Sequence, residues 1–505
     1  MNKKRIKVGM VSLGCPKNLV DSEAMLGLID EEGFQITPDA DEAEIIVINT
    51  CGFIGDAKKE SIDAILEMAD KKQGNCRFLI VTGCLSERYA DSFERELPEV
   101  DAVLGTGDYI NIVDVIKSLL DGKKGSDGGV VFRRGNILEY SVAERIAHLG
   151  CSRIITTGSG YTYVKIAEGC DNHCSYCIIP TLRGSYASRE ISDIVREISV
   201  ITADKPKEIV IVAQDITRYG KDIYGEFRIC ELIEEISELK NVKWIRLLYC
   251  YPDLIDAKLI QAIKQNEKLV KYLDIPIQHA SSKILEAMGR RYDEKQLREL
   301  ITWLRFEIPE IVLRTTMITG FPGETEDDYE RLKAFVADCK FERLGVFPYS
   351  MEEGTPAAAM GNKVAARIAA KRRSEILRLQ QGISRKKEQD RIGRVYEAVI
   401  NTTAIKHRYG AEHMYMAEHR PGAEHLPGAE HRPGAEHISG AEHMYMAEHR
   451  YGARTYAEAP EIDGTIRIWS DKEVADGEFV SVRITGADRY GLTGVIDGGA
   501  LTDMD

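Results

Sequence analysis

The feature that most constrains the fold is a repeated unit in which a short apolar strand is followed by a cysteine and an amphipathic stretch. The unit occurs three times near the N-terminus, with apolar runs at residues 6–12, 45–49 and 78–82. Alternation of apolar strands with helical segments is typical of a doubly wound parallel sheet that has helices on both faces. We therefore predict an α/β domain over residues 5–122.

The cysteines of these three units are Cys15, Cys51 and Cys84, and each follows its strand within three residues. Loops at the carboxyl ends of neighbouring parallel strands open into one crevice, so the three thiols are expected to converge. The alternative is three unrelated core thiols, because free cysteine is often simply buried. The same placement at three successive strand ends favours a shared metal site.

A second set of three cysteines is close in sequence. Cys170, Cys174 and Cys177 have the spacing C-x3-C-x2-C directly after an apolar run at 163–166. A structural zinc site normally has four Cys or His ligands, and His173 would be the candidate for the fourth. His173 directly precedes Cys174, however, and adjacent residues do not easily reach one ion. A cubane iron-sulfur cluster held by three cysteines leaves one iron open, which fits this set better.

The C-x3-C-x2-C spacing resembles that of the radical S-adenosylmethionine enzymes, in which the open iron chelates the methionine end of the cofactor. Combined with the runs Leu13-Gly-Cys-Pro-Lys-Asn18 and Asn49-Thr-Cys-Gly-Phe53, it resembles the methylthiotransferases over nearly the whole chain. The resemblance implies S-adenosyl-L-methionine and two 4Fe-4S clusters as cofactors, with chemistry carried by the cofactors and not by side chains. It also implies the metal ligands Cys15, Cys51, Cys84, Cys170, Cys174 and Cys177.

The middle of the chain, residues 156–390, contains six short apolar runs separated by helix-like stretches. Six units are fewer than the eight of a closed barrel and predict a partial (β/α)6 barrel, with the functional groups on the loops after the strands. By the family resemblance, Gln214, Gly320 and Gly323 contact S-adenosylmethionine. Residues of these types at strand ends also commonly serve as caps and turn formers.

Alternating strands over residues 393–503 predict a small antiparallel β-barrel, which by its position resembles the TRAM domain, a substrate-recognition module. An insert at about 406–453 interrupts it, with Ala-Glu-His recurring every six residues. Histidine-rich tracts can bind metal. We favour an expanded surface loop, because lengthening a loop costs little free energy and the repeat has no large aliphatic residue at a fixed position.

Within the methylthiotransferases, the chain is most similar to the members that methylthiolate the β carbon of an aspartate of ribosomal protein S12. Outside the insert, the C-terminal region holds 6 Lys and Arg against 12 Asp and Glu, which favours a basic protein partner over tRNA. The alternative is a tRNA methylthiotransferase acting on isopentenyladenosine, a group that usually has Cys-Gln-Met-Asn where this chain has Cys-Pro-Lys-Asn. A non-catalytic iron-sulfur electron carrier is a third hypothesis.

Composition and the N-terminal residues bear on the cellular setting. The first apolar stretch is too short for a signal peptide or a membrane span, so we expect a cytoplasmic protein without a membrane partner. Eleven cysteines then argue for metal or redox use in a reducing compartment. We expect a monomer, and the resemblance implies a reduced carrier such as flavodoxin or ferredoxin as electron donor. The sulfur donor is not identified.

Overall fold

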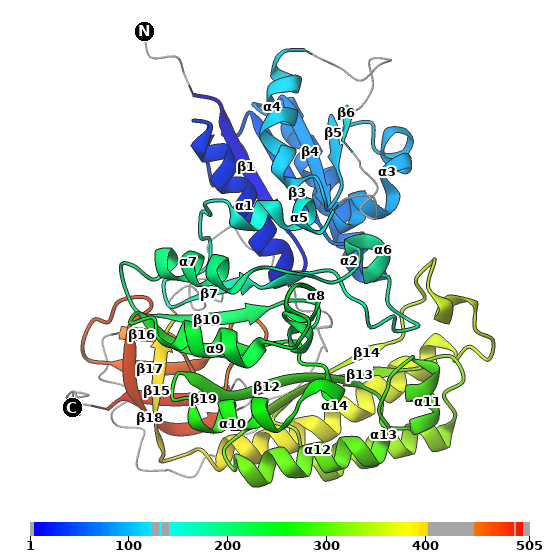
Figure 1. Ribbon diagram of the computed structural model, residues 1–505, viewed down its shortest axis with the longest axis vertical. Coiled ribbons are helices and arrows are strands. Elements are labelled where there is room, and N and C mark those ends of the chain that lie inside the picture. The colour runs from blue at the N-terminus through cyan, green and yellow to red at the C-terminus, as the bar shows by residue number, and fades with distance from the viewer. Residues whose placement is uncertain (1–4, 123–130, 134–140, 402–448, 489–490, 498–505) are drawn as a thin grey trace, which may run out of the picture.

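The computed structural model describes residues 5–122, 131–133, 141–401, 449–488 and 491–497, and it contains two parallel sheets and a small barrel (Figure 1). Most of the Ala-Glu-His insert therefore lies outside the described residues. No helix within these ranges is both long enough and apolar enough to cross a bilayer.

The N-terminal sheet has six parallel strands in the order β2-β1-β3-β4-β5-β6, and the predicted doubly wound architecture is confirmed. Side chains of α1 and α4 form a buried core on one face, and side chains of α2 and α3 form another on the opposite face. The strands are β1 (Lys7–Ser12), β2 (Gln35–Ile36), β3 (Ile45–Thr50), β4 (Phe78–Gly83), β5 (Ala102–Leu104) and β6 (Val131–Arg133), and the helices are α1 (Pro16–Glu31), α2 (Gly55–Asp70), α3 (Cys84–Glu96) and α4 (Ile112–Leu120).

Local sequence explains the central elements of this sheet. Every residue of β3 is buried, as expected for an interior strand of a parallel sheet with both faces covered. Helix α1 has Pro16 at its start, where the missing N–H costs no hydrogen bond, so Cys15 occupies the N-cap position. The short strands β2, β5 and β6 were not predicted, because runs of two or three residues show no periodicity. Strand β6 also extends the sheet beyond the expected boundary at residue 122.

The central sheet has six parallel strands in the order β14-β13-β12-β11-β10-β7, and its two end strands are not joined, which confirms the partial barrel. A single large apolar core unites these strands with the surrounding helices. The strands are β7 (Tyr161–Lys165), β10 (Lys207–Val212), β11 (Val242–Leu247), β12 (Leu269–Gln278), β13 (Val312–Thr319) and β14 (Arg343–Pro348). The main helices are α7 (Ile191–Ile201), α9 (Ile229–Ser237), α10 (Ala257–Gln265), α12 (Glu294–Glu307), α13 (Glu326–Cys339) and α14 (Ala366–Gln389).

The C-terminal domain is a closed barrel in the order β15-β16-β17-β19-β18. Its pairs are antiparallel, as predicted, except for β17 with β19, which are parallel. The strands are β15 (Val395–Ile400), β16 (His449–Thr455), β17 (Ile466–Ser470), β18 (Phe479–Asp488) and β19 (Gly491–Ile496). Residues 449–453, which we expected in the insert, instead begin β16, where they pair with β17 from His449 opposite Ser470 to Ala453 opposite Ile466.

Residues 455–463 connect β16 to β17 and lie against the interior of the half-barrel. Tyr161 donates a hydrogen bond to Glu461 (2.6 Å), and Tyr272 donates one to Asp463 (2.8 Å). The C-terminal domain thus fills the half-barrel near the amino ends of its strands.

Residues that follow the carboxyl ends of the strands contact the N-terminal domain: Tyr249, after β11, lies beside Lys17, and Glu352, after β14, pairs with Lys58. In Figure 1 the N-terminal domain lies above the edge strand β7.

Candidate active site at two cysteine triplets

The structure brings Cys15, Cys51 and Cys84 together from the ends of β1, β3 and β4. A Cβ atom on Gly14 would lie 2.8 Å from the Cβ of Cys51, and one on Gly52 would lie 2.7 Å from the carbonyl oxygen of Cys84. The three loops therefore touch, and glycine is required at both contacts. Because the strand order reverses between β1 and β3, this is also the place where open α/β sheets bind ligands.

The environment of this triplet suits metal-bound sulfur. Burial raises the pKa of Cys51 well above its usual range, and the neighbouring Cys84 and Cys15 raise it further. Three neighbouring thiolates, of which Cys84 is buried and Cys15 and Cys51 are partly buried, would repel one another, so a cation among them stabilises the site. Iron bound by thiolates supplies that positive charge, and the all-sulfur donor set fits a cluster.

Cys170, Cys174 and Cys177 occupy one loop after β7. The backbone N–H of Cys177 donates to the carbonyl of Cys174 (3.0 Å), and that of Cys170 donates to the carbonyl of Gly184 (3.1 Å). Burial raises the pKa of Cys177 to about 12, with further increases from Cys174 and Cys170. This set fits a cluster for the same electrostatic reason.

A single metal ion fits less well than a cluster. Among the described residues, no three His, Cys, Asp or Glu side chains are close enough together to hold one ion. A cluster fills the space between its ligands and keeps the thiols further apart than the ligands of one ion. His173, the candidate fourth zinc ligand, is exposed and has a positive φ of 50°.

Neighbouring loops of the half-barrel hold the cysteine loop in place. Asn172 donates to the carboxylate of Asp215 (2.7 Å), in the loop after β10. Ser175 donates through its backbone N–H to Met288 (3.0 Å) and through its hydroxyl to Ala287 (2.8 Å). The loop is therefore fixed on two sides.

The two triplets lie next to each other. Cys84 packs in one buried cluster with Ile178 and Leu182, and Ile178 directly follows Cys177. Arg183, at the end of α6 (Ile179–Arg183), donates to the sulfur of Cys84 (3.5 Å). One short helix thus connects the loop of the second triplet with a cysteine of the first.

A buried ionic network extends from this contact. Arg183 donates to Asp21 (2.9 Å) and Glu168 (2.9 Å), and Lys165 forms ion pairs with both carboxylates. His148 contacts Asp21 as well (2.9 Å). Burial would raise the pKa of Asp21, but Lys165 and Arg183 lower it well below its usual range. Sequence reasoning missed this network, although a lysine in an otherwise apolar strand was a usable signal.

Of the three predicted cofactor contacts, Gln214 is the best placed. Its amide donates to Glu168 (2.6 Å), two residues before Cys170, while its buried Oε1 has no hydrogen-bond partner among the described residues. Gly320 has a φ of 77°, and a Cβ atom there would lie 2.3 Å from the Cβ of Ala369. Gly323 has a φ of 85°. Both glycines thus have backbone roles, and all three contacts stay predictions.

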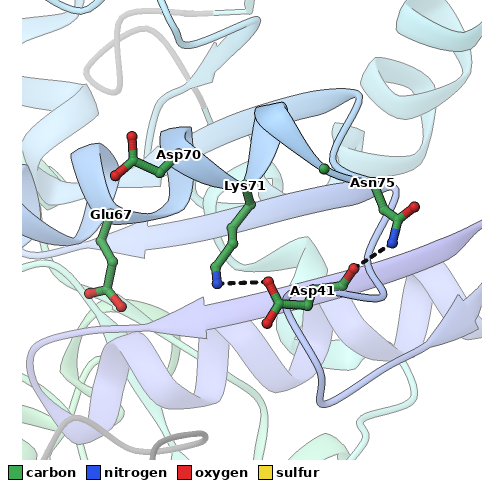
Figure 2. A pocket seen from close by; sticks show the side chains of 6 residues that line it. Asp41, Glu67, Asp70, Lys71 and Asn75 are labelled. Atoms are coloured by element: carbon green, nitrogen blue, oxygen red, sulfur yellow. Dashed lines mark hydrogen bonds and ion pairs between the residues drawn. The ribbon is translucent and has the colours of Figure 1, made fainter.

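A separate pocket of about 460 Å³ lies at the far end of the N-terminal sheet (Figure 2). Lys71 bonds to the carboxylate of Asp41 (2.7 Å), and the amide of Asn75 bonds to the Asp41 carbonyl (2.7 Å). Residues at the end of α2 and just after it line the pocket, whereas Cys51 precedes the start of α2. It is therefore distinct from the cysteine site.

Three family models match successive parts of the chain. They are the uncharacterized protein family UPF0004 at residues 7–105, the radical SAM superfamily at 164–336 and the TRAM domain at 442–496. The first match contains one cysteine triplet and the second match contains the other. A solved structure of the radical S-adenosylmethionine methyltransferase TsrM from Kitasatospora setae is 14% identical with a TM-score of 0.52, and the match covers 70% of this chain and 74% of that one. This likeness shows the fold alone.

Curated relatives match over nearly their whole length. The ribosomal protein uS12 methylthiotransferase RimO of Acetivibrio thermocellus is 44% identical, over 97% of this chain and 98% of that protein. The protein of the same name from Caldicellulosiruptor saccharolyticus is 44% identical, over 97% and 100%. These relatives favour the S12 hypothesis over the tRNA alternative. With its two cysteine triplets, half-barrel and C-terminal barrel, the chain belongs to the RimO family of radical S-adenosylmethionine methylthiotransferases.

Proposed function

We propose that the chain methylthiolates the β carbon of an aspartate of ribosomal protein S12. The observation that carries this proposal is the contact of Cys84, in one cysteine triplet, with Ile178 and Arg183, which follow the other triplet. When bound, two 4Fe-4S clusters and S-adenosylmethionine supply a radical that removes hydrogen from the β carbon, and the sulfur and methyl group that replace it.

The six cysteines have two roles in this proposal. Cys170, Cys174 and Cys177 would hold the cluster that binds S-adenosylmethionine. Cys15, Cys51 and Cys84 would hold the cluster that carries the sulfur to be transferred. The three thiols of each set leave one position free, because a four-iron cluster with four protein ligands would have no vacancy.

Other side chains of this chain orient the site and keep it dry. Ile178 and Leu182 are almost fully buried beside Cys84 and exclude water from one side of the site. Arg183 bridges the two domains through its fork of donors and hydrogen-bonds to a cysteine sulfur, an interaction that tunes iron-sulfur centres. The chain thus fixes the distance between the two cysteine sites.

Partners follow from the same chemistry. We propose a reduced carrier such as flavodoxin or ferredoxin as the electron donor and a monomeric enzyme acting in the cytoplasm. The C-terminal barrel presents three acidic residues, Asp471, Glu473 and Glu478, and one basic residue, Lys472, in its exposed β17–β18 connection. Opposite charge steers association, so this surface suits a basic ribosomal protein.

Deletion of the gene, followed by mass spectrometry of S12 and of tRNA, tests the function. We expect the methylthio mass to disappear from the S12 aspartate and the modified nucleosides of tRNA to remain. Restoration of the S12 modification by a plasmid copy of the gene is the control. Persistence of the group on S12 together with its loss from tRNA would overturn the proposal.

A further inference from the structure

Lys17 is a buried cation that has no carboxylate partner among the described residues, and its neighbours are Tyr249 and Cys15. Its side chain is on α1, and only 8% of the residue is exposed. Its ammonium lies 3.3 Å from the centre of the Tyr249 ring. Within the described part of the chain, no carboxylate lies within ion-pair distance of this ammonium, whereas the nearby buried Lys165 has two.

The position of Lys17 links the two cysteine sets. It is two residues from Cys15. Its partner Tyr249 follows β11, and the Tyr249 carbonyl accepts a hydrogen bond from the N–H of Ile216 (3.1 Å). Ile216 adjoins Asp215, which holds the other cysteine loop through Asn172. The ammonium therefore lies on a path of contacts that joins one triplet to the loop of the other.

Asp274, an acidic group beside Tyr249, is already engaged. Asp274 accepts from the N–H of Tyr249 (3.1 Å) and lies 3.8 Å from Arg314. Arg314 in turn pairs with Asp463 of the C-terminal domain (2.6 Å). Tyr249 itself has a positive φ of 65°, a conformation that is costly for a bulky residue and tends to persist at functional sites.

A buried ammonium without a carboxylate partner is unfavourable, so a carboxylate that enters the site would be held there. The cofactor carboxylate is not the best candidate, because the open iron of the Cys170 set takes the methionine end of S-adenosylmethionine in the proposed function. The substrate aspartate supplies another carboxylate. Its β carbon is bonded directly to that carboxylate, so a cation that holds the carboxylate beside Cys15 also holds the β carbon beside the sulfur-donating site.

We propose that Lys17 binds the side-chain carboxylate of the substrate aspartate and thereby selects an acidic residue for modification. This role rests on the proposed function and adds to it a residue that reads the substrate. Tyr249 supports the ammonium through its ring face, a favourable arrangement for a cation that is partly removed from water.

Peptide binding to protein with both clusters reconstituted tests this role. Two fluorescent peptides span the modified segment of S12, one with the target aspartate and one with asparagine in its place. We expect the wild-type enzyme to bind the aspartate peptide at least about tenfold more tightly than the asparagine peptide. Lys17→Met and Lys17→Gln should abolish this preference, whereas Lys71→Met, at the far end of the same domain, should keep it.

The outcomes separate this role from the proposed function. An undiminished preference for aspartate in both Lys17 variants, in a protein that still modifies S12, would overturn the role of Lys17 alone. Failure of the unmodified protein to bind either peptide would overturn the proposed function and the role of Lys17 with it. Iron content is measured on the same samples and should not change. A loss of iron in the variants would assign Lys17 to cluster binding and also overturn the role.

Discussion

The two cysteine triplets present the same three thiols by opposite means. Cys170, Cys174 and Cys177 come from one loop, and their spacing alone brings them together. Cys15, Cys51 and Cys84 are far apart in sequence and meet only because β1, β3 and β4 are neighbours in the sheet. The first triplet depends on a local loop and the second on a folded domain. Metal binding at the second should therefore be coupled more strongly to folding.

Removing each triplet gives the largest expected effect and tests whether the two are separate sites. Replacement of Cys170, Cys174 and Cys177 by Ala should remove about half of the reconstituted iron and abolish cleavage of S-adenosylmethionine. Replacement of Cys15, Cys51 and Cys84 should also remove about half of the iron but spare that cleavage. Iron analysis and detection of deoxyadenosine measure both effects. Unchanged iron content in either variant would refute its assignment.

Breaking the bridge between the triplets should have the next largest effect. Arg183→Met leaves the buried carboxylates Asp21 and Glu168 without one of their cations, and such changes cost roughly 3–5 kcal/mol of unfolding free energy. Arg196→Met removes an exposed arginine that pairs with Asp193 and should cost less than about 1 kcal/mol. Urea unfolding compares the two. Equal losses would show that the network does not stabilise the fold.

At the amino ends of its strands, the half-barrel contacts the C-terminal domain through ion pairs and not through the cysteine triplets. Burial would raise the pKa of Glu458, but Arg391 and Arg343 lower it from 4.5 to about 2. A carboxyl group whose folded-state pKa is lowered stabilises the fold above its unfolded pKa, and this stabilisation is lost as the pH falls toward the folded pKa. The contribution is on the order of 3 kcal/mol at neutral pH.

Urea unfolding at several pH values measures this contribution. The difference in unfolding free energy between the unmodified protein and Glu458→Gln should shrink by about 2 kcal/mol between pH 7 and pH 3. For Glu226→Gln, at an exposed ion pair with Arg228, the difference should change little. A pH-independent difference for Glu458→Gln would contradict the expectation.

A smaller change tests whether metal binding by Cys15, Cys51 and Cys84, the dispersed triplet, depends on the packing of their loops. Gly52→Ala would place a methyl group 2.7 Å from the Cys84 carbonyl oxygen, and overpacking of this kind costs roughly 1–3 kcal/mol. We expect weaker iron binding at the dispersed triplet, with cleavage of S-adenosylmethionine retained. Gly382→Ala, at a helix position with no atom within 4 Å, is the matched control. Equal iron content in the two variants would argue against this coupling.

The same contrast explains how much of the molecule was predictable. The long apolar strands are local patterns, and they predicted both parallel sheets. The spacing of Cys170 to Cys177 is also a local pattern, and it predicted a cluster site on one loop. The convergence of Cys15, Cys51 and Cys84 followed from a rule about strand ends. The network around Arg183 and the position of Lys17 depend on contacts between domains, which no periodicity reports. Gly320 was predicted as a ligand contact, and a packing requirement against Ala369 also accounts for it.

The placement of residues 455–463 inside the half-barrel has a consequence for protein engineering. Tyr161, Tyr272 and Arg246 all bond to this segment, so part of the catalytic domain's interior is supplied from the end of the chain. An exchange of C-terminal barrels between enzymes, made to change substrate choice, would therefore also replace part of that interior. Chimeras need the recipient's residues 455–463 kept between β16 and β17 of the new barrel if the recipient's catalytic domain is to stay intact.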